Sequence, residues 1–475
     1  MTAAPPFTVA ALEFYERPVR LRMPFRFGAT TLSAAPQAFV RARVRLADGR
    51  EARGAAAELM APKWFDKDLA RSQEDNVDRL RVSLVLAREA YLAGGANTAF
   101  GHFQAHYADQ IRLAAERGLN ALEANYGPAL IDRALLDALC RVLGVSFYGA
   151  LQSNLPGVEP AGWLAEFARF DMSAFLGGLE PQHSIAARHT VGLADPITAA
   201  EQSHRVDDGL PETLEEVVAR YGQRYFKLKL GGELHADIER LMAIAAVLDR
   251  GAEPYYVTLD GNEQYDDLEG VLALWRRILA ERRLKRLAAS MLFVEQPIKR
   301  SNALAERVSK LAAETPVIID ESDDSLESFA HARALGYTGV SSKTCKGLYK
   351  SLINRARCEV WNQAAQGRRY FMSGEDLTVQ AGLALQQDLA LVSILGLTHV
   401  ERNGHHYVNG MAGLPDAEQV AFQVAHSDLY ENSHGSVRVA IRGGALSIRS
   451  LECVGFASRA LPDWRVMRRV RYGEQ

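Results

Sequence analysis

The chain has 475 residues, of which 55 are basic and 58 are acidic, so its formal net charge is −3. Hydrophobic residues make up 48% of the sequence and charged residues 24%, alongside 37 glycines and 17 prolines. This composition excludes a disordered chain and a collagen-like repeat, and it indicates a large buried core. The near-neutral charge supplies no basic field for a nucleic acid, so a metabolic enzyme is the better expectation.

The N-terminus and the cysteines predict a cytoplasmic protein. The first residues, Met-Thr-Ala-Ala-Pro-Pro, lack the charged segment and apolar stretch of a secretory signal. The longest apolar stretch, residues 389–397, is too short to cross a bilayer, so no membrane partner is expected. The cysteines are too far apart for a C-x-x-C motif and indicate neither a zinc site nor a disulfide framework; they are Cys140, Cys345, Cys358 and Cys453.

Two strand-like segments, residues 7–22 and 38–58, open the chain. The second breaks at Ala47-Asp48-Gly49, a hairpin signal. From Asn76 to about Leu151 the apolar spacing becomes helical, which predicts an α+β domain over residues 1–154. Residues 431–475 return to strand-like alternation around Gly443-Gly444 and are expected to rejoin the first sheet, while residues 155–189 fit neither pattern and are interpreted as an insertion at the domain junction.

From about Thr190 short apolar runs alternate with longer amphipathic stretches. Eight candidate strands can be counted, at residues 190–193, 225–230, 255–260, 291–297, 316–320, 339–343, 370–374 and 398–401. The middle five end 31, 35, 25 and 23 residues apart, close to the roughly 31 residues per unit of an eightfold βα barrel. The sequence therefore predicts an α/β fold, with a (β/α) TIM-type barrel over residues 190–430 and a discontinuous α+β capping domain.

Three consecutive strands of this barrel end in a carboxylate, at Asp260, Glu295 and Asp320. The carboxyl ends of barrel strands converge on the rim where active sites are built. Three neighbouring negative charges repel one another unless a cation lies between them, and hard oxygen ligands favour Mg²⁺ or Mn²⁺. Acidic residues also cap the helices that follow such strands, but three in succession favour a metal site.

Two lysines lie on the strand before the first carboxylate. Lys227 and Lys229 point to one face of that strand, while the apolar Phe226 and Leu228 point to the other. The apolar face favours lysines that line the barrel over lysines on a solvent-exposed edge. A second ammonium and a divalent cation nearby would lower the pKa of a lysine toward the range of a general base.

A third lysine, Lys343, ends the strand that follows the Asp320 unit. It lies four strands along from Lys229, so the two lysines are expected on opposite sides of an eight-strand ring, with the metal between them. They would then face one substrate carbon as two bases. Lys346 is the alternative inward-facing lysine, with Lys343 structural, but the strand register favours Lys343.

Together these residues resemble the enolase superfamily, in its muconate-lactonizing and dipeptide-epimerase-like branch. The resemblance spans nearly the whole chain and rests on five ordered motifs: K-x-K at 227–229, D-x-N at 260–262, E-Q-P at 295–297, D-E-S at 320–322, and Lys343. It implies that three carboxylates bind Mg²⁺, those of Asp260, Glu295 and Asp320. It also implies that Lys229 and Lys343 act as acid and base, with assistance from Lys227.

The resemblance also implies the reaction class. Removing the α-proton of a carboxylate yields an unstable dianion, and Mg²⁺ stabilises the enediolate that forms. One lysine would remove the proton, and the other would return it on the opposite face or assist a leaving group. We therefore expect a racemase, epimerase or cycloisomerase acting on a small carboxylic acid, such as an N-substituted amino acid or a lactone precursor. The alternatives are a lyase of the same fold and a barrel that binds a ligand without turnover, and a homo-oligomer would fit the family.

Departures from the family pattern bear on the substrate. Where the mandelate-racemase branch has a catalytic histidine at the seventh strand end, this chain reads FMSGED, which disfavours that branch. Where dipeptide epimerases have an acidic D-x-D at the eighth, it reads HVERN, which puts a dipeptide in doubt. Glu401 could still hold one amine, and Arg402 would suit an anionic or polyhydroxy substrate.

The loops of the capping domain share in specificity in this family. Residues 24–28 and Trp64-Phe65 are expected to form a lid with an apolar wall, or alternatively to belong to the core of the small domain. With the strand-end residues, they complete the set of expected substrate contacts: Asn262, Glu321, Glu375, Asp376, Glu401, Arg402, Phe27 and Trp64.

Overall fold

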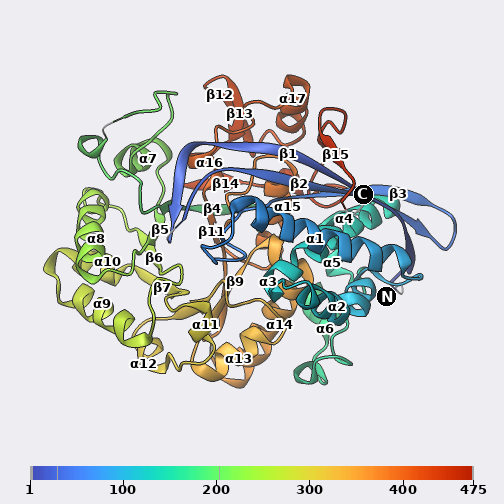
Figure 1. Cartoon of the computed structure of the whole chain (residues 1–475), viewed down its shortest axis with the longest axis horizontal. Coiled ribbons are helices and arrows are strands. Elements are labelled where there is room, and N and C mark those ends of the chain that lie inside the picture. The colour runs from blue at the N-terminus through green and yellow to red at the C-terminus, as the bar shows by residue number, and fades with distance from the viewer. Residues whose placement is uncertain (1–3, 29, 203, 368, 473–475) are drawn as a thin grey trace.

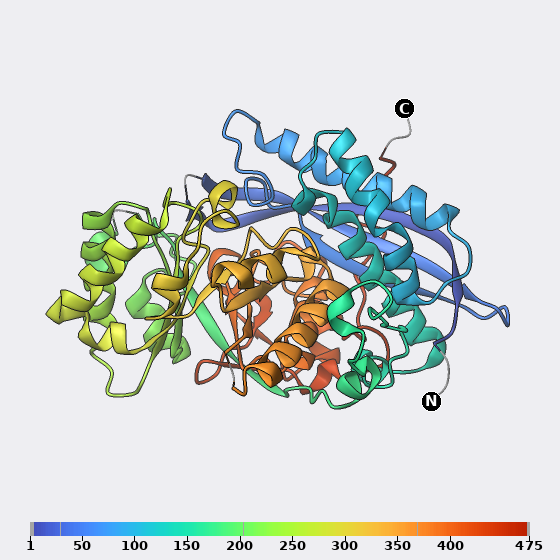
Figure 2. The ribbon, with the colours of Figure 1, turned by 90° about the horizontal axis from the view of Figure 1, so that it is seen from below.

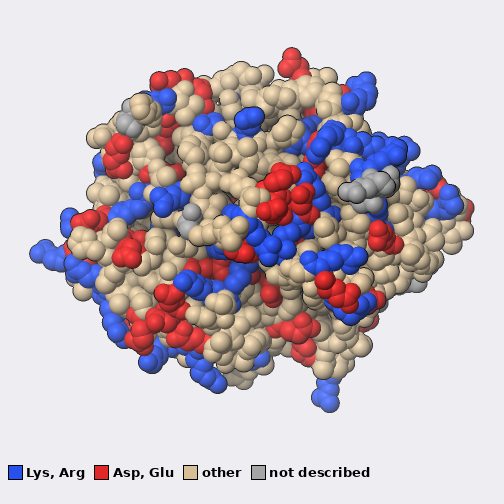
Figure 3. All heavy atoms as spheres, in the orientation of Figure 1, with Lys and Arg blue, Asp and Glu red and all other residues tan. Residues whose placement is uncertain are grey.

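The structure is a computed structural model that describes residues 4–472 except 29, 203 and 368. It consists of a closed barrel and a capping domain whose long strands extend across the barrel (Figures 1 and 2). Basic and acidic side chains are mixed over the face seen in Figure 3, as the near-neutral charge leads one to expect. Within the described residues, no helix is both long and apolar enough to cross a membrane.

The capping domain is built on a four-stranded antiparallel sheet in the order β15-β1-β2-β3. Its strands are β1 (Phe7–Phe27), β2 (Thr30–Leu46), β3 (Glu51–Leu59) and β15 (Arg468–Val470). Two helices pack against it, α1 (Gln73–Ala93) and α4 (Tyr126–Leu143), and their apolar residues recur at helical spacing. The helices that pack on these two are α2 (Ala99–Glu116), α3 (Ala121–Ala124) and α5 (Phe147–Gln152).

Gly54 of β3 is where the capping sheet and α4 approach most closely. A Cβ added there would lie 2.2 Å from the backbone nitrogen of Ala138 and 2.3 Å from the carbonyl oxygen of Ala134. Since backbone atoms cannot move aside cheaply, we expect Gly54→Ala to destabilise the protein by about 3 kcal/mol or more. Calorimetry would show a melting temperature several degrees lower, whereas Gly95→Ala, which meets nothing within 4 Å, is the control. Equal melting temperatures for the two variants would contradict this packing.

The helical layer of the capping domain also buries a carboxyl group, that of Asp132 on α4. It is 2% exposed and accepts a hydrogen bond from the Tyr91 hydroxyl at 2.7 Å. Burial raises its pKa to about 8. An aspartate in an unfolded chain titrates near about 3.9, so between these values the folded protein holds a proton that the unfolded chain has lost. The free energy of unfolding should therefore fall as pH rises through this window.

Asp132→Asn tests this linkage, because an asparagine stays neutral throughout the range. We expect the variant to match the parent melting temperature near pH 4 and to exceed it at pH 8, with a free-energy difference of a few kcal/mol, at about 1.4 kcal/mol per pH unit. The check is a series of melting temperatures against pH for both proteins. Parallel pH profiles would show that Asp132 is ionised in the folded protein.

The barrel contains eight parallel strands in sequential order, closed by pairing of β11 with β4. This confirms the predicted fold class. The strands are β4 (Ser184–Val191), β5 (Tyr225–Lys229), β6 (Tyr256–Asp260), β7 (Met291–Glu295), β8 (Val317–Ile319), β9 (Gly339–Ser342), β10 (Phe371–Gly374) and β11 (His399–Arg402).

Helices lie around the outside of the barrel (Figure 1). The main ones are α7 (Leu214–Tyr221), α8 (Leu234–Leu248), α9 (Leu268–Ala280), α13 (Ser328–Leu335), α14 (Leu348–Ala364) and α15 (Leu383–Ile394). Shorter ones are α6 (Met172–Gly177), α10 (Lys285–Ala289), α11 (Arg300–Ala303), α12 (Ser309–Ala312), α16 (Gly404–Tyr407) and α17 (Asp416–Ala425).

Two boundaries differ from the sequence prediction. The first barrel strand, β4, begins at Ser184, so residues 184–189 of the expected insertion belong to the barrel. Of the C-terminal segment, only β15 joins the capping sheet. Strands β12 (Tyr430–Ser433) and β13 (Ser436–Val439) form a hairpin of their own, and β14 (Ala445–Ser447) pairs antiparallel with β4. Alternating hydrophobicity identifies a strand but not its partner, and this is why the segment was placed wrongly.

Candidate active site

The candidate site lies at the carboxyl ends of β5 to β9. Each strand delivers its charged side chain into the barrel because the alternate residues face the surrounding helices. The six side chains are all 6% exposed or less; they are Lys227, Lys229, Asp260, Glu295, Asp320 and Lys343. The structure therefore brings together every lysine and carboxylate that the sequence placed at the centre.

Lys227 lies at the middle of this cluster. Its Nζ is 2.9 Å from Asp260 Oδ2 and 2.8 Å from Glu295 Oε1. It also lies 2.9 Å from Glu375 Oε2 and 3.0 Å from Glu401 Oε2. Burial alone would lower the pKa of Lys227, but these carboxylates raise it well above its ordinary range. Lys227 is thus a fixed cation that holds four acidic side chains together.

Lys229 and Lys343 lie on opposite sides of the ring, since β5 and β9 are four strands apart in it. The Nζ of Lys229 is 2.6 Å from Asp260 Oδ2, and the Nζ of Lys343 is 2.6 Å from Asp320 Oδ2. Both ammonium groups line one small cavity of about 20 Å³. Each lysine therefore has its own carboxylate partner while facing the same space.

The sequence left Lys346 as the alternative to Lys343, and the geometry separates the two. Lys346 follows the short turn Thr344–Lys346 and does not line the cavity. Its Nζ donates to Ser341 Oγ at 2.7 Å and lies 3.1 Å from Asp323 Oδ2. Lys346 therefore supports the Asp320 strand end from behind.

Charge balance sets the protonation of the carboxylates. Burial, together with the neighbouring Asp260 and Glu375, raises the pKa of Glu295 well above its ordinary range. Burial alone would also raise the pKa of Asp320 and Glu401, but the nearby lysines hold both below their ordinary range. Glu295 is thus the carboxylate of this cluster that has the greatest deficit of positive charge around it.

Aromatic side chains of the capping domain close the cavity. Phe25 and Phe27 come from the end of β1, and Trp64 from the loop after β3. The Trp64 ring centroid is 4.3 Å from Lys343 Nζ, and that of Phe25 is 5.9 Å from Lys229 Nζ. The structure fits both expectations for these aromatics, because they belong to the buried hydrophobic core and also line the cavity beside Lys229 and Lys343.

The remaining expected substrate contacts divide into three kinds. Asn262, Asp376 and Glu401 line the cavity, although Asp376 already accepts bonds from the backbone nitrogens of Leu377, Val379 and Asn403. Glu321 and Glu375 lie behind it, bonded to Lys67 and to Lys227 respectively. Arg402 points elsewhere, because its guanidinium pairs with Asp388 and lies 3.6 Å from Asp376.

Comparison with known proteins connects this geometry to a family. A family model described as enolase C-terminal domain-like, of the mandelate racemase and muconate lactonizing type, matches residues 209–421. The match covers most of the barrel, so the barrel is similar to this family of domains. A search of curated proteins gave no significant match to the sequence.

Solved structures show the same two-domain fold. A mandelate racemase/muconate lactonizing protein from Herpetosiphon aurantiacus is 19% identical with a TM-score of 0.61, covering 96% of this chain and 99% of its own. A muconate lactonizing enzyme from Pseudomonas fluorescens, complexed with muconolactone, is 18% identical with a TM-score of 0.58, covering 97% of each chain. A dipeptide epimerase from Enterococcus faecalis V583, complexed with Mg and the dipeptide L-Leu-L-Tyr, is 14% identical with a TM-score of 0.61, covering 95% and 99%.

The carboxylates at the carboxyl ends of the barrel strands fit a divalent cation by donor type. Asp260, Glu295 and Asp320 supply hard oxygen ligands, and Glu295 Oε2 is buried with no hydrogen-bond partner among the described residues. In the present arrangement the lysines are paired with these carboxylate oxygens. Within the described residues, no three His, Cys, Asp or Glu side chains lie close enough together to bind a metal ion without moving. A cation would therefore have to draw the carboxylates from their lysine partners.

Two polar residues of the site were missed by the sequence reading. Arg188 of β4 is fully buried, pairs with Glu375 and places its guanidinium over the Phe293 ring at 5.6 Å. Asn403 lines the cavity and donates from Nδ2 to Glu401 Oε1 at 3.1 Å. A charged residue within the apolar run of β4 was the available signal for Arg188, but this strand was expected to begin after it.

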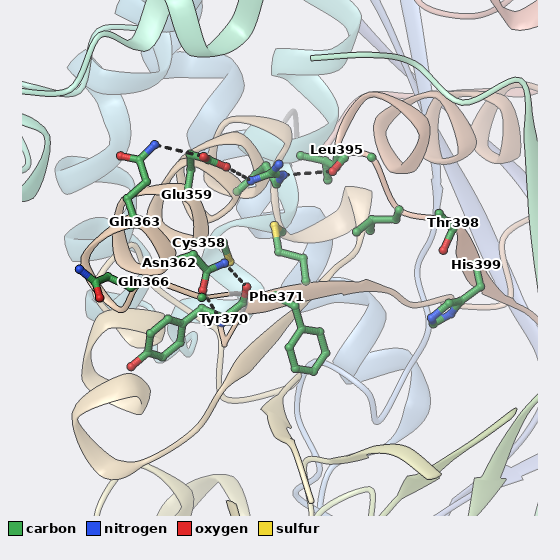
Figure 4. A pocket seen from close by; sticks show the side chains of 15 residues that line it. Cys358, Glu359, Asn362, Gln363, Gln366, Tyr370, Phe371, Leu395, Thr398 and His399 are labelled. Atoms are coloured by element: carbon green, nitrogen blue, oxygen red, sulfur yellow. Dashed lines mark hydrogen bonds and ion pairs between the residues drawn. The ribbon is translucent and has the colours of Figure 1, made fainter. Parts of the chain in front are cut away.

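A larger cavity, of about 740 Å³, lies at the opposite end of the enolase-type barrel (Figure 4). It is bounded by α14 and by Phe371 and His399, the first residues of β10 and β11. The charged residues that line it, Arg355 and Glu359, pair with each other at 3.3 Å. Since the lysines and carboxylates converge at the other rim, this cavity is separate from the candidate site.

Proposed function

We propose that the chain is a Mg²⁺-dependent enzyme that removes the α-proton of a small carboxylic acid, with Mn²⁺ as a substitute metal. We further propose that it is a racemase, epimerase or cycloisomerase. The observation that carries this is the placement of Lys229 and Lys343, which face one cavity from opposite strands of the ring, each beside a different carboxylate. Two such groups can exchange protons with both faces of one carbon.

The residues divide the work as follows. Asp260, Glu295 and Asp320 would hold the cation, which when bound neutralises the charge that develops on the substrate carboxylate as the α-proton leaves. One lysine takes that proton at Nζ, and the opposite ammonium donates its own proton to the other face, so the number of protons is unchanged. Lys227 keeps the surrounding carboxylates in place, and the aromatic lid excludes water.

The lysines must be neutral to act as bases. Although burial opposes it, the Asp320 carboxylate holds the pKa of Lys343 above its ordinary range in the present arrangement. A cation that took over Asp320 would weaken its ion pair with Lys343, and this would bring the pKa of Lys343 down. Cation binding and base activation are thus coupled in this site.

The lining of the cavity favours an acid with an apolar group and a neutral hydrogen-bond donor. Phe25, Phe27 and Trp64 supply the apolar wall. Asn262 and Asn403 each donate from Nδ2 to a glutamate, which leaves their buried Oδ1 atoms without partners among the described residues. These oxygens accept hydrogen bonds, so an N-acylated amino acid suits the cavity better than a free ammonium, whose usual carboxylate partners are already engaged.

Deuterium exchange in D₂O tests the proposal. With Mg²⁺ present, we expect deuterium at the α-carbon of recovered N-acetyl amino acids with apolar side chains, such as N-acetylphenylalanine, and none after chelation of the metal. Free phenylalanine and dipeptides are the matched comparison. An unsaturated or keto product would instead identify a lyase, and an acid that binds without exchange would identify a non-catalytic barrel.

A further inference from the structure

A cluster of charged side chains fastens a loop of the capping domain, residues 60–72, to the barrel. The Nζ of Lys67 lies 2.6 Å from Glu263 Oε2 and 3.1 Å from Glu321 Oε1. It also donates to the carbonyl oxygen of Asn262 at 2.9 Å. These barrel residues follow the ends of β6 and β8, so one lysine of the cap bridges two loops of the catalytic rim.

Arg300, the first residue of α11, completes this cluster from a third loop. Its Nε donates to Glu263 Oε1 at 2.8 Å and its Nη2 to Glu263 Oε2 at 3.0 Å. Nη1 and Nη2 also donate to the carbonyl oxygens of Phe65 and Trp64, at 2.9 Å and 3.0 Å. Arg300 therefore binds the backbone of the lid directly, and Glu263 is the shared anion between the two cations.

The cluster holds Trp64 in the position that closes the site. The indole is 3% exposed and lies over the Lys343 ammonium. The cavity beneath it, about 20 Å³, has room for about one water molecule. Since this is smaller than any carboxylic acid, the loop must move before a substrate reaches the lysines.

The exposure of the cluster suits such a movement. The side chains of Lys67 and Arg300 are 25% and 27% exposed, whereas that of Glu263 is 5% exposed. When the loop lifts, the Lys67 ammonium passes into water, and Glu263 keeps Arg300 as its partner. The buried Glu321 side chain, 0% exposed, then loses its cation partner and keeps the hydrogen bond from Asn262 Nδ2, so the closed position of the loop is favoured in the absence of substrate.

We propose that Lys67, Glu263 and Arg300 form a latch that opens to admit the acid and closes again to position Trp64 over Lys343. Lys67 and Arg300 are then positioning residues for the reaction. The proposal rests on the proposed function only in taking Lys343 as a group that acts on substrate. The test of this latch does not require the protein to turn over a substrate.

Hydrogen–deuterium exchange of the unliganded protein is the experiment. Lys67→Met removes the bridging cation, and Arg300→Lys keeps the charge but cannot reach Glu263 and two carbonyl oxygens at once. We expect amides in residues 60–72 to exchange about tenfold faster in each variant, with α4 unchanged. Lys299→Met is the control, because Lys299 pairs only with the exposed Asp266. Acylation of Lys343 by acetic anhydride, followed by peptide mass spectrometry, should accelerate in parallel.

The parent protein provides a second measurement if a variant proves unstable. Salt screens partly exposed ion pairs, so raising the ionic strength should speed exchange in residues 60–72 and acylation of Lys343. Unchanged exchange and acylation, in the variants or in high salt, would overturn the latch. A failure of the acid panel would remove the proposed function but would leave these two readouts intact.

Discussion

Lys229→Met and Lys343→Met should each lower α-proton exchange by about a thousandfold, the usual contribution of a positioned general base. Methionine keeps the length and apolar stem of lysine but cannot carry a proton. Because the two lysines face the substrate from opposite sides, each variant should lose exchange with only one enantiomer. The measurement is deuterium incorporation into each enantiomer of an exchanging acid, followed by NMR.

Lys310→Met is the matched control for these variants. Lys310 lies on the short helix α12, is 74% exposed and has only a long contact of 3.4 Å to Glu269. The Lys310→Met variant should exchange the α-proton of both enantiomers at the parent rate. If either site variant kept full exchange with both enantiomers, that lysine would have no part in the mechanism. Loss of Mg²⁺ binding in the variants would instead show that the lysines act through the carboxylates.

Glu295→Gln should weaken Mg²⁺ binding by about a hundredfold or more, since even second-shell changes cost about 10- to 100-fold at metal sites. The amide preserves the shape of the side chain, so Lys227 keeps its other three carboxylates. Mg²⁺ should raise the melting temperature of the parent, because a ligand that binds only the folded state stabilises it. The same addition of Mg²⁺ should hardly change the melting temperature of Glu295→Gln.

The control for this variant is Glu269→Gln, whose side chain is 65% exposed and pairs only with Lys310. Its titration with Mg²⁺ should match the parent. Equal Mg²⁺ affinity in Glu295→Gln and the parent would remove the carboxylate cluster as the metal site. Proton release on Mg²⁺ binding, followed by calorimetry in buffers of different ionisation enthalpy, gives an independent check, since Glu295 has a raised pKa before the cation binds.

The barrel and its central residues could be predicted because their signals are local. When a strand is apolar on one face and ends in a charged residue, its sequence indicates both the direction of the strand and the side chain that it places at the rim of the barrel. Lys229 and Asp320 are predicted in this way. The regular spacing of the strands then placed them around a ring. Predicting which residues lie at the strand ends of a barrel does not require knowing which distant residues are in contact.

Contacts between residues that lie far apart in the sequence could not be predicted in the same way. Arg300 and the backbone of Trp64 are joined across 236 positions, and nothing local to either residue indicates the other. Arg402 was misleading for the opposite reason. It is the last residue of β11 and so lies where substrate contacts are expected, yet its guanidinium pairs with Asp388 on α15 instead of facing the cavity. Pairing between distant charges depends on the assembled fold rather than on sequence pattern.

The pairing of β15 with β1 has a consequence for how the chain matures in the cell. The outer edge of β1 is covered at Phe14–Glu16 by Arg468–Val470, and Glu16 accepts hydrogen bonds from Arg468 and from the hydroxyl of Tyr472. During synthesis this part of the edge stays open until Arg468, which lies 452 positions after Glu16, has been added. A ribosome-bound chain therefore carries a long unpaired strand beside a largely finished barrel, and such edges invite association with other chains. A fusion partner at the C-terminus that delays this final pairing should raise aggregation more than one at the N-terminus.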